Sequence, residues 1–104
     1  MNEAEKNIIR KMVEMKILRA DAVERSQSKS LDAAERRRAV FDHAEYVAVF
    51  TTLADMAEEL GLGLEYDKAM ERVYKAFPQE DGEPDQSYYG RLAREVFAGS
   101  FAEG

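Results

Sequence analysis

Apolar residues recur at helical spacing along most of the chain and predict four helices. Lys16 lies inside the apolar side of the first helix, at about residues 3–24, and Leu18 lies outside it, which indicates a bend or a second contact surface. The Ser-rich stretch 26–30 ends this helix, because serine hydroxyls compete for backbone hydrogen bonds. At 100° per residue, the following positions share its apolar side: Ile8, Ile9, Met12, Val13, Met15, Ile17, Ala20 and Val23.

A second, long helix is predicted from about residue 31 to residue 60. Asp32, followed three residues later by Glu35, forms a capping pair at its start. Its middle, residues 46–54, is apolar on nearly all sides, which is typical of a helix enclosed by its neighbours. Gly61 ends the helix, because glycine adopts the left-handed conformation at little cost. We therefore expect this helix at the centre of the domain.

Two shorter helices follow, at about residues 64–77 and 86–98. Pro78 ends the third helix, because the residue before a proline is excluded from helical geometry, and Asp85 is the predicted N-cap of the fourth. The acidic segment 78–85 between them is a predicted loop, and Phe101 is expected to fold back onto the helices. The pattern predicts one all-α domain over residues 1–104, a four-helix antiparallel bundle-like domain with a long central second helix.

Composition and charge narrow the classes of function. The chain has no cysteine and no apolar run long enough for a membrane span, and its first residues lack the features of a signal peptide. We therefore expect a cytoplasmic protein. The net charge is −6, and it is uneven: residues 1–52 carry 10 basic and 9 acidic side chains, whereas residues 53–104 carry 5 and 12. The acidic half repels nucleic-acid phosphates and attracts basic protein surfaces.

The acidic loop and its neighbouring tyrosines form the predicted partner-binding surface. The loop does not match a calcium-binding loop, since Gln86 and Leu92 stand where glycine and a bidentate glutamate are needed. Exposed tyrosines beside carboxylates suit a protein interface with a basic partner. The predicted contact residues are Tyr74, Glu80, Asp81, Glu83, Asp85 and Tyr88.

Arg38 and His43, the one histidine of the chain, suggest an alternative function. Four residues separate them, and this spacing resembles the R-x(4–6)-H motif of the HEPN family, small helical bundles that include RNases. The resemblance covers about eight residues, and Ala39 replaces the polar residue that often follows the arginine of the family. It implies that the two side chains meet across a dimer interface, where the imidazole acts as acid and base and the guanidinium holds a phosphate.

A second alternative is a DNA-binding regulator, because residues 53–77 resemble a helix-turn-helix. Ala57, Gly61 and Leu62 stand where that motif places a small residue, a glycine and an apolar residue. A basic stripe on the following helix, formed by Lys68, Arg72 and Lys75, is then the candidate recognition surface. Asp67 departs from the motif, since an apolar residue is usual there.

The sequence contains no further enzyme motif, no zinc-ligand cluster and no glycine-rich phosphate loop. The function that we expect is therefore a small non-enzymatic protein-binding module without metal or cofactor, such as an adaptor or an inhibitor of the kind that phages and mobile elements encode. A homodimer is a further hypothesis, because a second copy could cover the part of the long helix that three shorter helices leave exposed.

Overall fold

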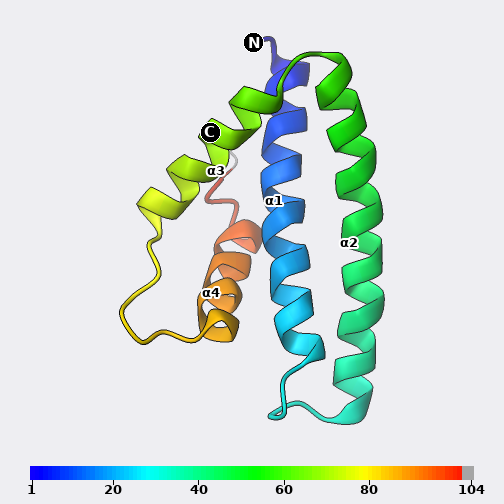
Figure 1. Ribbon diagram of the computed structural model, residues 1–104, viewed down its shortest axis with the longest axis vertical. Helices are drawn as coiled ribbons and strands as arrows, with labels where there is room; N and C mark the ends of the chain where they lie inside the picture. Colours follow the sequence, from blue (N-terminus) through cyan, green and yellow to red (C-terminus); the bar gives the residue numbers. More distant parts are fainter. Residues whose placement is uncertain (102–104) are drawn as a thin grey trace.

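Four helices form the chain in the computed structural model, which describes residues 1–101. They are α1 (Glu3–Ser26), α2 (Ala33–Glu59), α3 (Gly63–Ala76) and α4 (Asp85–Phe97), and these residues contain no strand. α1 and α2 run antiparallel side by side, α3 crosses α1 obliquely, and α4 packs against the lower half of α1 (Figure 1). The predicted all-α, four-helix architecture is confirmed, and the second helix is the longest.

The centre of the packing is α1, and not α2 as the sequence had predicted. α1 contacts each of the other three helices, whereas α2 packs against α1, touches α3 slightly and does not contact α4. Ile17 and Leu18, neighbours on different sides of α1, are both buried, so the second contact surface that Leu18 indicated is present. In α2 the buried residues are the small Ala39 and Ala57. The apolar middle of α2 is therefore covered on one side and left open on the other.

Side-chain caps fix the starts of the two long helices. Asn2 and Glu5 form a reciprocal capping box, in which the Glu5 amide donates to Asn2 Oδ1 (2.8 Å) and the Asn2 amide donates to Glu5 Oε1 (3.0 Å). The predicted cap of α2 is confirmed, since the Glu35 amide donates to Asp32 Oδ1 (2.8 Å). Gly61, with φ at +71°, ends α2 in the left-handed conformation.

The start of α4 differs from the prediction. Pro84 occupies the N-cap position, and the helix begins at Asp85. No side chain forms a capping hydrogen bond at this end of α4. The Asp85 carboxylate instead accepts a hydrogen bond from Gln79 Nε2 (2.9 Å). Its side chain therefore ties the acidic loop to α4. None of the helices that the structure describes is long and apolar enough to cross a membrane.

Candidate docking surfaces

The acidic loop between α3 and α4 is braced by Arg91 of α4. Arg91 Nη2 donates to Glu83 Oε1 (2.7 Å) and to the Pro78 carbonyl oxygen (3.0 Å), and its Nε donates to Glu83 Oε2 (3.2 Å). The Glu80 amide also donates to Glu83 Oε1 (3.0 Å). These hydrogen bonds, the one from Arg91 above all, lower the pKa of the Glu83 carboxyl. Glu83 therefore holds the loop together, while Glu80 and Asp81 are exposed.

This brace predicts an acid-sensitive contribution of Glu83 to stability. Because its pKa is lower in the folded chain than the ordinary 4.5, the contribution is present above that value and is lost as the pH falls through the folded-state pKa. We expect Glu83→Gln to lower the free energy of unfolding at pH 7 and to change it little well below pH 4. Urea unfolding of both proteins at the two pH values measures this, and a difference that does not shrink in acid contradicts the brace.

The tyrosines beside the loop form a cluster of three, of which Tyr88 is buried. Tyr88 is 3% exposed, and its hydroxyl donates to the Phe77 carbonyl oxygen (2.6 Å). Its ring centroid lies 6.5 Å from that of Tyr74 and 5.3 Å from that of Tyr89. The prediction of Tyr88 as a contact residue is therefore wrong. Its ring is packed in the core and its hydroxyl is bonded to the Phe77 carbonyl oxygen, so neither is available to a partner. Tyr74 remains 37% exposed, next to the loop.

Arg38 and His43 do not face each other within one chain. Five residues along a helix turn the side chain by about 140°, and Arg38 is exposed whereas His43 is half-buried. His43 lines a shallow hollow together with Lys16, Arg19 and Tyr89. Lys16, the charged residue inside the apolar side of α1, thus lies in this hollow, and burial together with the charge of Arg19 lowers its pKa. The histidine has cationic neighbours, but Arg38 is not one of them.

The basic stripe of α3 is exposed, as predicted, but it is not uniform. Lys68, Arg72 and Lys75 all lie on the surface, and Lys75 Nζ forms an ion pair with Glu71 Oε1 (3.2 Å). α3 crosses α1 instead of packing along α2 (Figure 1). Within residues 1–101, no carboxylate lies at ion-pair distance from Arg72, which lines the groove described next.

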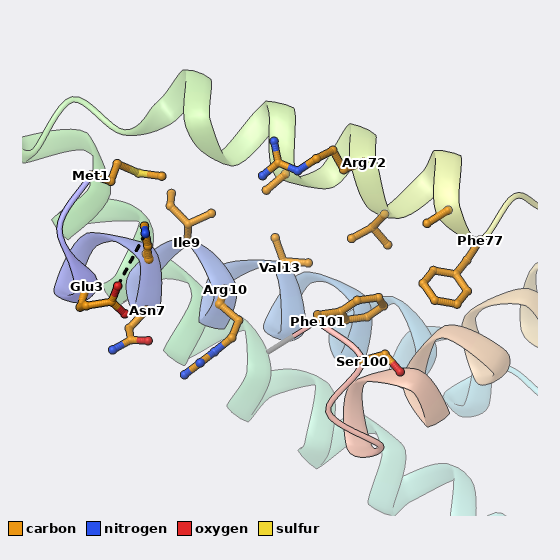
Figure 2. A pocket seen from close by; sticks show the side chains of 14 residues that line it. Met1, Glu3, Asn7, Ile9, Arg10, Val13, Arg72, Phe77, Ser100 and Phe101 are labelled. Carbon is orange, nitrogen blue, oxygen red and sulfur yellow. Dashed lines mark ion pairs between the residues drawn. The ribbon is translucent and has the colours of Figure 1, made fainter. Parts of the chain in front are cut away.

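A groove of about 560 Å³ lies between α1, α3 and the residues after α4. Its floor is apolar, and the ring of Phe101 packs edge-on against Phe77, with centroids 5.6 Å apart. The expected folding back of Phe101 is thereby confirmed. Figure 2 shows Ile9 and Val13 of α1 on the side facing α3, with the two phenylalanine rings at one end of the groove.

Positive charge surrounds this apolar floor. Lys6, Arg10 and Arg72 line the groove together with one carboxylate, Glu3. Lys6 Nζ lies 3.6 Å from Glu3 Oε1, the ion pair drawn in Figure 2, and Arg10 Nε lies 3.7 Å from Glu14 Oε1. The Lys6–Glu3 pair is largely exposed, and the side chains of Arg10 and Glu14 are 37% and 20% exposed; ion pairs that water reaches contribute little to stability. Their cations therefore remain accessible to a charged ligand.

Sequence reasoning did not find this groove, because its walls come from three separate segments. The sequence places Arg72 in a basic stripe suited to DNA, and the expected folding back of Phe101 is the one signal that points to this region. In the part of the chain that the structure describes, no three histidine, aspartate or glutamate side chains gather as a metal site would require. No protein-family model, curated protein or solved structure matches the chain.

Proposed function

We propose that the chain is a non-enzymatic protein-binding module whose groove between α1 and α3 receives an acidic amphipathic helix of a partner protein. The observation that carries this proposal is the apolar groove with three cations at its edge. A concave apolar site with a few polar groups is the usual form of a binding site. Adaptors and inhibitors both act through such a surface, so the proposal covers either role.

The chemistry of the groove favours an amphipathic helix over a flat surface. Such a helix inserts apolar side chains at positions i, i+3, i+4 and i+7 into a groove and keeps its polar face outside. Met1, Ala76 and Phe101, which line the groove and are exposed or partly exposed, would contact the apolar side chains. Arg10 and Arg72 would then lie beside the polar face, where carboxylates complement their charge.

The exposed carboxylates of the acidic loop offer a second docking surface, for a basic partner. The hydrogen bonds that Glu83 accepts from Arg91 and from the Glu80 amide hold the loop backbone at Glu80 before binding, which reduces the entropy lost on association. This surface has one partly exposed aromatic side chain, Tyr74. The groove combines several apolar side chains with three cations, and it is therefore the surface to test first.

A pair of matched peptides tests the charge preference of the groove. One is an amphipathic helical peptide with leucines on one face and glutamates on the other, and the second has lysines in place of the glutamates. We expect the acidic peptide to bind more tightly in fluorescence anisotropy at low salt. The net charge of the chain, −6, favours the opposite order, so preference for the basic peptide contradicts the proposal and supports docking on the acidic loop.

Variants then locate the bound peptide. Arg10→Glu combined with Arg72→Glu should weaken binding of the acidic peptide by about tenfold or more, since each change replaces attraction by repulsion. The matched control is Lys11→Glu combined with Lys68→Glu, which reverses two exposed cations outside the groove. If the control pair weakens binding as much as the groove pair, binding depends on net charge alone and the groove is the wrong site.

A further inference from the structure

The outer face of α2, a strip that includes Phe41, Ala44, Ala48 and Thr52, is not covered by the rest of the chain. Phe41 is 74% exposed, and Val40, Val49 and Met56, which flank the strip on its two sides, are also on the surface. Between residues 40 and 54, Glu45 is the one exposed side chain with a charge. The Thr52 hydroxyl already donates to the Ala48 carbonyl oxygen (3.1 Å). Between Phe41 and Thr52 the strip therefore offers a partner helix contact with few polar groups to desolvate, whereas Asp55 adds an exposed charge beyond it.

The shape of the chain indicates that one face lacks a partner. The principal extents are 43 × 29 × 20 Å, and the accessible surface is 6650 Å². A folded monomer of 11.8 kDa has about 5900 Å² by the usual scaling of surface with mass. α2 forms one outer edge of the molecule, against α1 alone along most of its length (Figure 1). The extended shape leaves this outer side of α2 uncovered.

We propose that this strip pairs with the same strip of a second copy, so that the two α2 helices run antiparallel about a two-fold axis at Ala48. The outermost positions of α2 are symmetric about residue 48: four residues away on either side lie Ala44 and Thr52, seven away Phe41 and Asp55, and eleven away Arg37 and Glu59. A two-fold interface needs such a self-complementary surface. Across an axis at Ala48, Ala44 would face Thr52 and Arg37 would face Glu59 of the second copy.

In the antiparallel arrangement, basic residues at one end of the strip face acidic residues of the second copy. A parallel arrangement would not bring opposite charges together. Arg37 and Arg38 at the start of the strip would face Glu59 and Glu58 of the second copy, whereas a parallel pair would place arginine beside arginine. Among residues 1–101 these four side chains form no ion pair within the chain. Each dimer would therefore gain two sets of opposite charges at its ends.

The centre of the strip consists of small side chains. Ala44, Ala48 and Thr52 follow one another at intervals of four residues on the exposed side of α2. Helix axes approach to about 8 Å where the contact residues are small. Phe41, which is level with Asp55 of the second copy, would then pack between that residue and Thr52. The strip from residue 37 to residue 59 is about 33 Å long. One helix pair of this length is smaller than a standard interface, so we expect a weak dimer that dissociates on dilution.

Sedimentation equilibrium over a hundredfold range of concentration tests the proposal. The chain should sediment as a dimer at high concentration and dissociate on dilution. Ala48→Arg places two like charges at the two-fold axis and should raise the dissociation constant by about tenfold or more. Lys11→Glu combined with Lys68→Glu, at exposed positions off the strip, should leave the dissociation constant unchanged.

Circular dichroism checks that Ala48→Arg retains its helices. A chain that is monomeric at every concentration overturns the proposal, and so does a dimer that Ala48→Arg leaves intact.

Charge exchange tests the antiparallel direction. Arg37→Glu combined with Arg38→Glu should dissociate the homodimer, and so should Glu58→Arg combined with Glu59→Arg, because like charges then meet at both ends. An equimolar mixture of these two variants should form a heterodimer with both contacts restored. If either variant alone dimerises as well as the original chain, the proposed pairing is wrong.

A single cysteine tests the position of the axis. The chain has no cysteine, so Ala48→Cys introduces one thiol per copy, and two such residues on a two-fold axis lie within the Cα separation that a disulfide requires, about 4.4–6.8 Å. We expect rapid formation of a covalent dimer on mild oxidation. Lys68→Cys, equally exposed on α3, should form it slowly. Equal rates for the two variants contradict an axis at Ala48.

Discussion

Ile17→Ala should lower the free energy of unfolding by about 2–5 kcal/mol, the usual range for removing a large aliphatic side chain from a core. Ile17 is 0% exposed and belongs to α1, the helix that contacts all three others. The substitution would therefore leave a cavity where several helices meet. No single helix can move in to fill it without disturbing its packing against α1. A single small domain has about 5–15 kcal/mol in total, so this one change removes a large share.

Urea unfolding followed by circular dichroism measures the effect of Ile17→Ala, with Ile8→Ala as the matched control. Ile8 lies on the same helix and loses the same atoms, but it is only partly buried. We expect the control to cost clearly less, because part of its side chain is already in water. Equal losses for the two variants would contradict the central position of α1 in the core.

Arg25→Ala should cost about 1–3 kcal/mol, because it leaves a buried carboxylate without its partner. Asp21 is 8% exposed, and Arg25 Nε donates to its Oδ2 at 2.9 Å. Arg25 Nη1 also lies 3.5 Å from Asp42 Oδ2 of α2. The guanidinium therefore satisfies a charge within α1 and joins α1 to α2. Asp21 is buried, so water does not fully replace its interaction with Arg25, whereas the Asp42 side chain is 32% exposed and keeps contact with water.

A double-mutant cycle separates the cost of the unpaired charge from the loss of packing. Asp21→Asn removes the charge that Arg25 compensates, and Arg25→Ala in that background should cost less than in the original chain. Chemical unfolding of the four proteins gives the coupling free energy. Additive effects of the two substitutions would show that Asp21 and Arg25 do not stabilise each other.

The elements of the fold follow from local patterns, but their arrangement does not. Hydrophobic periodicity, the Asp32 cap and Gly61 were sufficient to place the long helix to within about two residues at each end. The same periodicity indicates that residues 46–54 can be buried, and it does not indicate by what. The position of Leu18 outside the apolar side of α1 was the better indicator of the central helix, because a helix with contacts on several sides needs apolar residues on several sides.

The candidate sites show the same division. Composition predicted that the loop is acidic, and Glu80 and Asp81 are exposed as expected. It could not predict that Glu83 pairs with Arg91, eight residues later, or that Tyr88 turns inward to the Phe77 carbonyl. Those contacts depend on how α4 packs. The groove required the relative placement of α1, α3 and Phe101, which no local pattern contains.

The two proposals are compatible and have a joint consequence. No residue of α2 lines the groove between α1 and α3, so pairing through α2 would leave both grooves of a dimer open. A partner with two acidic helices could then bind both copies, and its apparent affinity would exceed that of either site alone. Each proposal can fail separately, because Ala48→Arg changes no groove residue and Arg72→Glu changes no residue of the strip.

The most direct test of the groove is an NMR titration of the methyl-labelled protein with the acidic amphipathic peptide. The proposal predicts the largest shifts at Ile9, Val13 and Val73, which line the groove, and small shifts at Val40 and Val49 of the exposed α2 face. The two sets report on the two apolar surfaces in one spectrum. Shifts confined to Val40 and Val49, or no methyl shifts on saturation with peptide, would contradict docking between α1 and α3.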